Sequence, residues 1–175
     1  KEIFSMIYRK NMWGESKHKK KFDSGFGSRN NKIIDGFVSN VNNFITNLNY
    51  KPTILDIGCG DFNVGRNFVE YTNKYIAGDV SKVILERNSH IFSHLKNVEF
   101  KHVNLSNDDL PRGDVCFVRQ VLQHLSNANI MAFVTYINKH RPYKKLIITE
   151  HLPVKQGFKE NLDKPTGAHS RLIFG

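Results

Sequence analysis

Apolar and polar positions along the chain follow two different periods. Between residues 33 and 48, apolar residues recur at helical spacing, which predicts an amphipathic helix that lies against a sheet. From residue 53, short apolar runs alternate with amphipathic segments, and they predict strands at 53–57, 74–79, 98–103, 114–119 and 145–149. The segments between them predict helices at 63–71, at 82–95 with Ser81 as its cap, and after Ser126 or Asn127.

This order of elements predicts a doubly wound α/β fold. Short apolar strands separated by amphipathic helices indicate a mainly parallel sheet that is covered on both faces, with right-handed crossovers. Ligands of such sheets lie beyond the carboxyl ends of the strands, so the residues that follow each strand should converge on one cleft. Residues 1–30 are expected to be a lead-in or lid segment, and residues 31–175 a single domain.

Composition and charge limit the class of protein. With 39% hydrophobic residues and two cysteines, the 175 residues suit a globular domain without a disulfide framework or a zinc cluster, and a cytoplasmic location is expected. No apolar run approaches the roughly 20 residues that span a bilayer, so no membrane association is expected. The net charge is +10, but residues 1–32 carry nine basic against three acidic side chains, so much of the excess is local. The basic run at 17–21 is interpreted as a solvated segment rather than a phosphate-binding patch.

The stretch ILDIGCGDFNVG, residues 54–65, is a buried strand that runs directly into a turn of small residues. Glycine removes the Cβ that would hold a ligand away from the backbone. A dinucleotide site would place a third glycine where Asn63 stands, and the carboxylate of Asp61 would repel a pyrophosphate. A ligand with an ammonium and a sulfonium tolerates that carboxylate, which favours S-adenosylmethionine over NAD.

Two further polar residues follow neighbouring strands. Asp79 ends the second strand, 21 positions after Gly58, where a carboxylate accepts hydrogen bonds from both ribose hydroxyls. Asn104 closes the third strand and is placed to meet the edge of an adenine.

The ordered set of these motifs resembles a class I S-adenosylmethionine-dependent methyltransferase. The similarity rests on D-I-G-C-G at 56–60, G-D at 78–79 and the polar residue that closes strand three. The motif D-x-x-C-G-D-F-N, the run RQVLQHLS at 119–126 and Trp13-Gly14 resemble, more narrowly, a bacterial group of these enzymes. Two features depart from the pattern: Phe62 replaces the common third glycine, which should narrow the pocket or force another backbone path, and the usual C-terminal antiparallel strand pair is not apparent.

The resemblance implies a set of site residues. The residues expected to bind S-adenosylmethionine are Asp56, Gly58, Cys59, Gly60, Asp61, Asn63, Asp79, Val80, Asn104, Leu105, Arg119 and Gln120. Trp13 and Arg171 are expected to bind the substrate. No metal site is expected, because His90 and His94 share a helix face without a third ligand.

Three residues are candidates for catalysis. Methyl transfer from a sulfonium chiefly requires alignment, but a hydroxyl acceptor benefits from a base within hydrogen-bond reach. His151 and Glu150 follow the fifth strand, and His124 lies in the run after the fourth, with a structural role as its alternative. His151 has the better location of the two histidines.

The sequence therefore predicts methyl transfer to the oxygen or nitrogen of a small molecule. One alternative is a nucleic-acid methyltransferase, which the basic lead-in favours and the lack of an Asn/Asp-Pro-Pro-aromatic motif after strand four disfavours. Another is a non-catalytic protein that binds S-adenosylmethionine or a nucleotide, which Phe62 and the missing terminal strands leave open. If Phe62 occupied the methionine end of the pocket, the cofactor would fail to bind. The oligomeric state is not predicted.

Overall fold

The computed structural model describes residues 2–14, 22–106, 109–152 and 158–171. The basic run at 17–21 lies entirely outside these residues. Five strands form one sheet in the order β3-β2-β1-β4-β5, and every neighbouring pair is parallel. The strands are β1 (Thr53–Ile57), β2 (Lys74–Asp79), β3 (Val98–His102), β4 (Val115–Arg119) and β5 (Lys145–Thr149). The predicted doubly wound sheet is confirmed, with strand ends within one residue of the expected ones.

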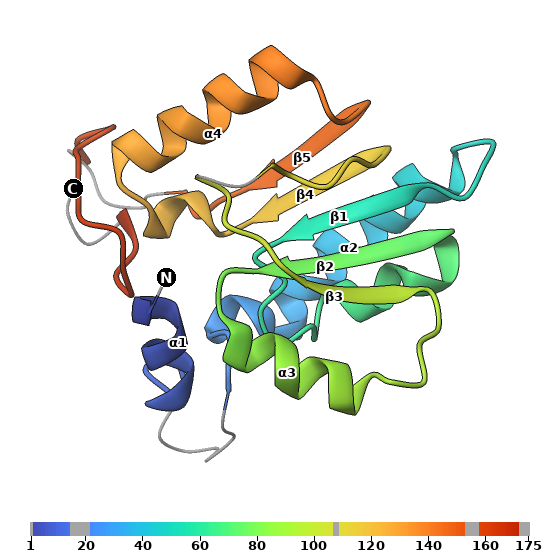
Figure 1. The fold of residues 1–175 in the computed structure, drawn as a ribbon, viewed down its shortest axis with the longest axis horizontal. Helices are drawn as coiled ribbons and strands as arrows, with labels where there is room; N and C mark the ends of the chain where they lie inside the picture. Colours follow the sequence, from blue (N-terminus) through green and yellow to red (C-terminus); the bar gives the residue numbers. More distant parts are fainter. Residues whose placement is uncertain (1, 15–21, 107–108, 153–157, 172–175) are drawn as a thin grey trace.

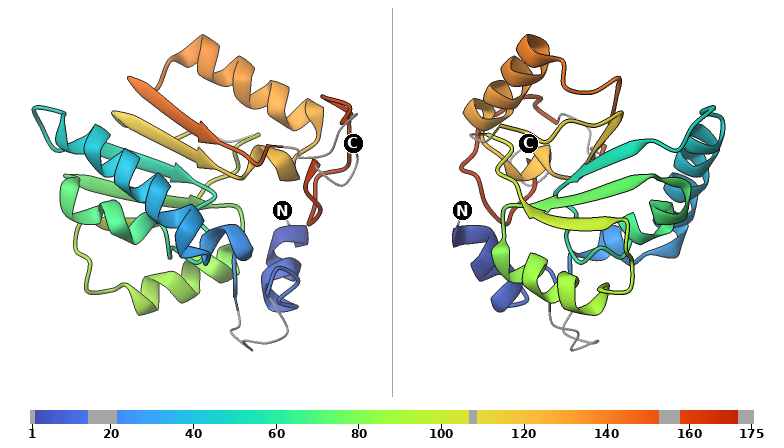
Figure 2. Two further views of the ribbon diagram at one scale, coloured as in Figure 1. Left: turned by 180° about the vertical axis from the view of Figure 1, so that it is seen from behind. Right: turned by 45° about the vertical axis from the view of Figure 1, so that its right-hand side comes forward.

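Helices cover both faces of the sheet (Figures 1 and 2). The helix α2 (Asn31–Thr46) and the 3₁₀ helix η2 (Gly65–Tyr71) lie on one face, and α4 (Asn127–His140) on the other. The predicted helix at 63–71 is thus a 3₁₀ segment, and α3 (Lys82–Ile91) ends four residues earlier than expected. Ser81 occupies the N-cap position of α3, but its hydroxyl makes no capping bond and instead lies 3.1 Å from the hydroxyl of Ser5.

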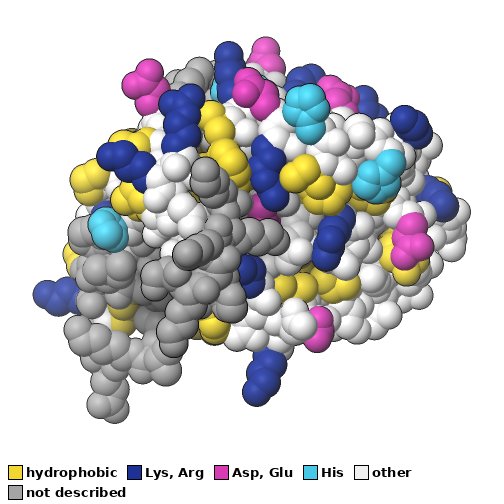
Figure 3. Space-filling view, turned by 90° about the horizontal axis from the view of Figure 1, so that it is seen from below, with side chains coloured by type: hydrophobic (Ala, Val, Ile, Leu, Met, Phe, Trp, Pro, Cys, Tyr) yellow, Lys and Arg dark blue, Asp and Glu magenta, His cyan; other side chains and the backbone are white. Residues whose placement is uncertain are grey.

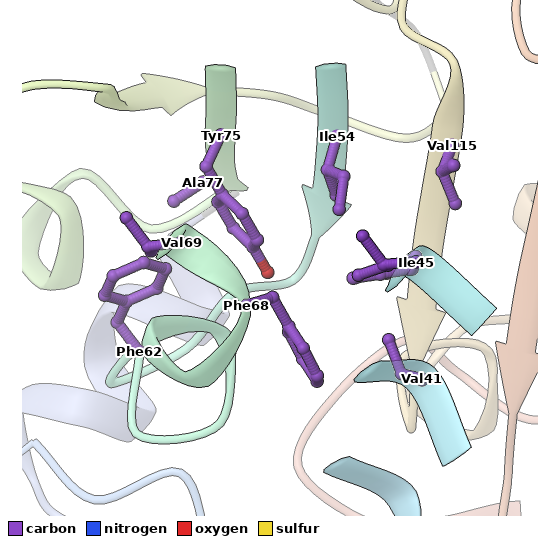
Figure 4. Packing of buried hydrophobic residues seen from close by; sticks show 10 residues of the cluster. Val41, Ile45, Ile54, Phe62, Phe68, Val69, Tyr75, Ala77 and Val115 are labelled. Atoms are coloured by element: carbon purple, nitrogen blue, oxygen red, sulfur yellow. The ribbon is translucent and has the colours of Figure 1, made fainter. Parts of the chain in front are cut away.

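The core is divided by the sheet because strand side chains alternate between its faces. Ile54 of β1 packs with Val41 and Ile45 of α2, whereas the next residue, Leu55, packs on the side of α4 with Phe133. Figure 4 shows the first of these clusters, in which Phe62 lies beside Val69 and Tyr75, and Phe68 lies between them and the α2 side chains.

Both terminal segments lie at the carboxyl ends of the strands. The helix α1 (Glu2–Arg9) packs beside α3. The segment 158–171 comes close to α1 in all the views of Figures 1 and 2. The indole of Trp13 joins the two, since its Nε1 donates a 3.1 Å hydrogen bond to the carbonyl of Ala168. None of the helices in the described part of the chain is long and apolar enough to cross a membrane.

Candidate active site

A cavity of about 330 Å³ opens at the carboxyl ends of the central strands. This volume lies at the lower end of the range typical of small-molecule sites. Its walls come from the turn after β1 and from the residues that follow β2, β3 and β4. Residues between 4 and 28 of the N-terminal segment complete them. Of the residues expected to bind the cofactor, all but Asn63 line it: Asp56, Gly58, Cys59, Gly60, Asp61, Asp79, Val80, Asn104, Leu105, Arg119 and Gln120.

The turn after β1 is held by hydrogen bonds on every side. The N–H groups of Gly58 and Cys59 both donate to the carbonyl of Gly78, at 2.8 and 3.0 Å. The N–H of Gly60 donates to Asp79 Oδ2 at 3.2 Å, and the carbonyl of Gly60 accepts from Asn88 Nδ2 at 2.7 Å. Gly58 and Gly60 have φ angles of +78° and +55°, in the left-handed region that favours glycine. The turn is therefore a rigid part of the fold.

Phe62 neither narrows the cavity nor diverts the chain. Its φ of +62° is the left-handed conformation that a glycine would adopt, so the backbone follows the glycine path with a phenylalanine in it. The ring is fully buried and does not line the cavity. It packs edge-on against Tyr75, Phe92 and Phe100, with ring centroids 5.5, 5.1 and 5.1 Å away. Both expected consequences of this substitution are wrong, because the side chain points into the core.

Two buried carboxylates line the cavity beside the turn. Burial raises the pKa of Asp79 to about 6, although the hydrogen bonds that its carboxylate accepts from backbone N–H groups favour the ionised form. Burial also raises the pKa of Asp56 to about 6, against a 2.9 Å hydrogen bond from the hydroxyl of Tyr75. Near pH 7 both are largely ionised, so the site attracts positive charge.

Asp61 and Asn63 connect the turn to the N-terminal segment. Asp61 donates its N–H to Ser24 Oγ at 2.7 Å, and its own carboxylate accepts from the N–H of Asn63 at 3.2 Å. Asn63 Nδ2 donates to the carbonyl of Ser28 at 2.6 Å. Asn63 thus does not line the cavity itself but bonds to Ser28, which does.

Arg119 is the one Lys or Arg side chain that lines the cavity within the described residues. Its Nη2 donates to the carbonyl of Gly27 at 2.7 Å, and its guanidinium lies 5.2 Å from the ring centroid of Phe37. Burial lowers the pKa of Arg119, while the carboxylates of Asp56 and Asp61 favour its charged form. It remains a cation beside a largely negative site.

Trp13 and His124 form another part of the cavity wall. Their ring centroids are 5.0 Å apart, and Tyr8 meets the indole edge-on at 5.5 Å. Burial, followed by the nearby ammonium of Lys164, lowers the pKa of His124 to about 4. The imidazole is therefore neutral at physiological pH.

Glu150, His151 and Arg171 lie away from this cavity and line a second one of about 500 Å³. Glu150 Oε1 accepts a 2.8 Å hydrogen bond from the N–H of Leu122, and burial raises the pKa of Glu150 to about 7. His151 is exposed. Of the three expected catalytic residues, the structure thus brings only His124 to the cavity that holds the glycine turn.

Several residues of the cavity were not expected from the sequence. Phe4, Phe37, Asn129 and Thr166 all line it. Phe37 and Asn129 belong to the helical patterns of α2 and α4, where nothing distinguishes a cavity residue from a core or surface one. Thr166 stands in an irregular Pro-Thr-Gly stretch, and its position depends on contacts with residues about 40 positions earlier.

Neither cysteine chemistry nor a metal centre is apparent here. Burial raises the pKa of the Cys59 thiol well above its ordinary value, so it stays protonated in the turn. Within residues 2–14, 22–106, 109–152 and 158–171, no group of three His, Cys, Asp or Glu side chains is placed to hold a metal ion.

Comparisons with known proteins agree with this geometry. The sequence profile of a family described as "Methyltransferase domain" matches residues 55–140, which include the turn, Asp79, Asn104 and the run with His124. A comparison with curated protein sequences finds no match.

Solved structures share the fold at low sequence identity. The methyltransferase domain of bacterial CtHen1 superposes with a TM-score of 0.58 and 20% identity, over 66% of this chain and 65% of that one. The YcgJ protein of Bacillus subtilis gives 0.54 and 20%, over 66% and 51%. The DhpI–SAH complex gives 0.50 and 17%, over 64% and 54%. The chain therefore spans between about half and two thirds of the length of these proteins.

The geometry of the site suits the cofactor of this fold. S-adenosylmethionine carries a sulfonium, an ammonium and two ribose hydroxyls, and the buried carboxylates of Asp56 and Asp79 favour a ligand with positive charges and hydroxyl donors. Residues 55–140 match a methyltransferase domain, for which S-adenosylmethionine is the implied cofactor, and the chain has the Rossmann-like fold of solved methyltransferases.

Proposed function

We propose that the protein transfers a methyl group from S-adenosylmethionine to the oxygen or nitrogen of an uncharged small molecule. The composition of the cavity wall carries this proposal: it holds the carboxylates of Asp56, Asp61 and Asp79, one guanidinium, and a group of aromatic and neutral polar side chains. A small cavity lined by three carboxylates and a single guanidinium suits a compact neutral acceptor better than a phosphate-bearing one.

The cofactor would be held by the residues at the strand ends. Asp79 would accept hydrogen bonds from the ribose hydroxyls, Val80, Asn104 and Leu105 would surround the adenine, and Arg119 would face the carboxylate of the methionine part. The other expected cofactor residues, Asp56, the turn at 58–61 and Gln120, would surround the same ligand, with Asn63 supporting them from behind. When bound, the cofactor supplies an electrophilic methyl group whose positive charge is dispersed as the acceptor attacks.

The acceptor would occupy the part of the cavity near Trp13 and His124. A neutral imidazole can accept a hydrogen bond or a proton from a hydroxyl or an amine, and so direct the lone pair of the acceptor. Trp13 offers an apolar wall, and Asn129 with Thr166 offers amide and hydroxyl groups at the same end. We therefore assign the catalytic role to His124. His151, Glu150 and Arg171 would act in catalysis or substrate binding only if the acceptor reached the second cavity.

The alternatives from the sequence lead to different tests. Nucleic-acid methylation rests on the basic run at 17–21, and on the face shown in Figure 3 the Lys and Arg side chains are scattered among polar and apolar ones. A non-catalytic protein would bind the cofactor without turnover. We also propose a cytoplasmic location, membership of the bacterial group with the D-x-x-C-G-D-F-N motif, and a lid role for residues 1–30.

The test begins with calorimetric titration of the protein with S-adenosylmethionine and, separately, NAD. Formation of S-adenosylhomocysteine is then followed with neutral sugars, phenols and primary amines, with their carboxylated or phosphorylated counterparts, and with a short RNA. We expect binding of S-adenosylmethionine alone and turnover with a neutral acceptor. Turnover confined to RNA, with a steep loss on adding salt, would establish the nucleic-acid alternative. Cofactor binding without turnover of any of these acceptors would favour the non-catalytic alternative.

A further inference from the structure

Residues 161–171 dock as a compact segment on the turn that follows β4. The carboxylate of Asp163 accepts from the N–H of Asn127 at 2.7 Å, at the first turn of α4. Thr166 Oγ1 accepts from the N–H of Ser126 and from Asn129 Nδ2, at 2.9 and 2.8 Å. The N–H of Gly167 donates to the carbonyl of His124 at 2.9 Å. We call residues 161–171 the clasp.

Among the charged residues of the clasp, Lys164 is the most buried, with 4% of its surface exposed. Lysine is almost never fully buried unless its ammonium finds partners. Here Nζ donates to the carbonyl of His124 at 3.1 Å and to that of Pro165 at 2.7 Å. The buried ammonium thus bonds directly to the backbone of the residue whose imidazole lines the cavity.

Arg171 binds the next backbone carbonyl along the chain in the same way. Its Nη2 donates to the carbonyl of Leu125 at 2.7 Å, and its Nη1 to that of Leu162 at 2.6 Å. The consecutive carbonyls of His124 and Leu125 therefore both accept from cationic side chains of the clasp. Two charged donors on adjacent peptide groups restrict the turn more strongly than neutral bonds would.

We propose that Lys164 is a positioning residue that fixes the turn carrying His124 against Trp13 at the acceptor end of the cavity. Trp13 supports this assignment independently, because its indole packs on the His124 ring and donates to Ala168 of the clasp. The imidazole thus packs on the indole, while the indole and the ammonium each donate to a backbone carbonyl, of Ala168 and of His124. The proposal rests on the proposed function, in which His124 directs the acceptor.

The ammonium also acts on the charge of the imidazole. Among the described residues, Lys164 is the charged side chain that lowers the pKa of His124, in addition to burial. Trp13 of the N-terminal segment and Gln123, which both contact the imidazole, are uncharged, and the backbone of residues 167–169 raises the pKa of His124. Loss of the ammonium should therefore raise the pKa of His124 as well as loosen the turn.

The test compares Lys164→Met with the wild type and with Lys139→Met, an exposed lysine at the end of α4 that serves as the matched control. The readouts do not depend on a known acceptor: the pKa of His124 from histidine NMR titration, the fluorescence of Trp13, which is the only tryptophan in the chain, and the affinity for S-adenosylmethionine. We expect the pKa of His124 to rise by about one unit and the Trp13 emission to shift to longer wavelength.

Cofactor affinity should change by less than about threefold, because Lys164 does not line the cavity. Once an acceptor is known, kcat should fall with little change in the KM of the cofactor.

The outcomes separate this proposal from the proposed function. An unchanged His124 titration and Trp13 emission in folded Lys164→Met would overturn the positioning role, whatever the acceptor is. Failure of the wild type to bind S-adenosylmethionine would count against the proposed function, while the two spectroscopic readouts would still decide the role of Lys164. If Lys164→Met does not fold, Lys164→Arg keeps the charge with a different donor geometry. It should then retain the low pKa of His124 and change the Trp13 emission, and an emission identical to the wild type would count against the proposal.

Discussion

The carboxylate of Asp79 accepts a hydrogen bond from the backbone N–H of Gly60, with 3.2 Å between Oδ2 and the nitrogen. Its other oxygen accepts from the N–H of Ser81 at 2.8 Å. The side chain that is expected to hold the ribose therefore also joins the glycine turn to the start of α3. Each carboxylate oxygen has more than one lone pair, so a bound ribose can share this group with the backbone.

Replacement of Asp79 by alanine should weaken the binding of S-adenosylmethionine by ~2 kcal/mol, or roughly 30-fold, since two charge-assisted hydrogen bonds are lost. Asn88→Ala is the matched control, because it releases the carbonyl of Gly60, whose N–H donates to Asp79, and Asn88 does not line the cavity. Calorimetry on both variants separates the two roles. Equal losses would mean that Asp79 acts only through the turn, and unchanged affinity in Asp79→Ala would remove it from the site.

Cofactor affinity should increase between pH 5 and pH 7.5. Burial raises the pKa of Asp56 and of Asp79 to about 6, so both lose their protons within this range and the site becomes more negative. S-adenosylmethionine carries the sulfonium charge and S-adenosylhomocysteine does not, so the increase should be steeper for the first ligand. Parallel titrations of the two ligands across this range would measure it, and identical slopes would show that the carboxylates do not act on the sulfonium.

The same carboxylates predict how the free protein responds to pH. A raised pKa means that the folded state keeps protons that the unfolded state has already released, so the free energy of unfolding falls as pH rises from about 4 to about 6. Glu150, with a pKa raised to about 7, extends this fall toward neutrality. Urea unfolding of wild type and Glu150→Gln at pH 4.5 and pH 8 would test this. The variant should gain stability relative to wild type at the higher pH only, and an equal difference at both pH values would contradict the linkage.

Truncation of Phe62 should affect stability and leave the cofactor site intact. The buried ring has three aromatic neighbours in the core, so Phe62→Ala should lower the free energy of unfolding by about 3–5 kcal/mol. Phe26→Ala, at a side chain that is 58% exposed, is the control and should change it by less than about 0.5 kcal/mol. Affinity for S-adenosylmethionine in the folded fraction should match the wild type. A selective loss of affinity would place the ring at the ligand after all.

Phe62 also shows how far the sequence leads. The strand and helix periods predicted the sheet, and the glycines predicted the turn, because both depend on neighbouring residues. Whether the side chain of Phe62 faced the cavity or the core depended on Phe92 and Phe100, which are 30 and 38 positions later. The D-x-x-C-G-D-F-N motif is compatible with a Phe62 side chain that points to the cavity and with one that points to the core.

The residues that follow β5 illustrate a second limit. Their place at a strand end favoured His151 and Glu150 as catalytic groups, as the general rule for parallel sheets suggests. In the structure Glu150 bonds to the N–H of Leu122, and these residues face the second cavity. The clasp that holds His124 is irregular in sequence, so its buried lysine could not be distinguished from an ordinary surface lysine.

The two histidines can be compared directly in turnover. His124 lines the cavity and is neutral, whereas His151 is exposed beside the second cavity. With an acceptor from the panel, His124→Gln should reduce kcat by about 100-fold, because the side chain that directs the acceptor is replaced by one that cannot take its proton. His151→Gln should stay within about twofold. Cofactor affinity, measured on both variants, should be unchanged, so that the loss is assigned to the acceptor step. The reverse order of effects would assign catalysis to the second cavity and would make Glu150 and Arg171 the next residues to replace.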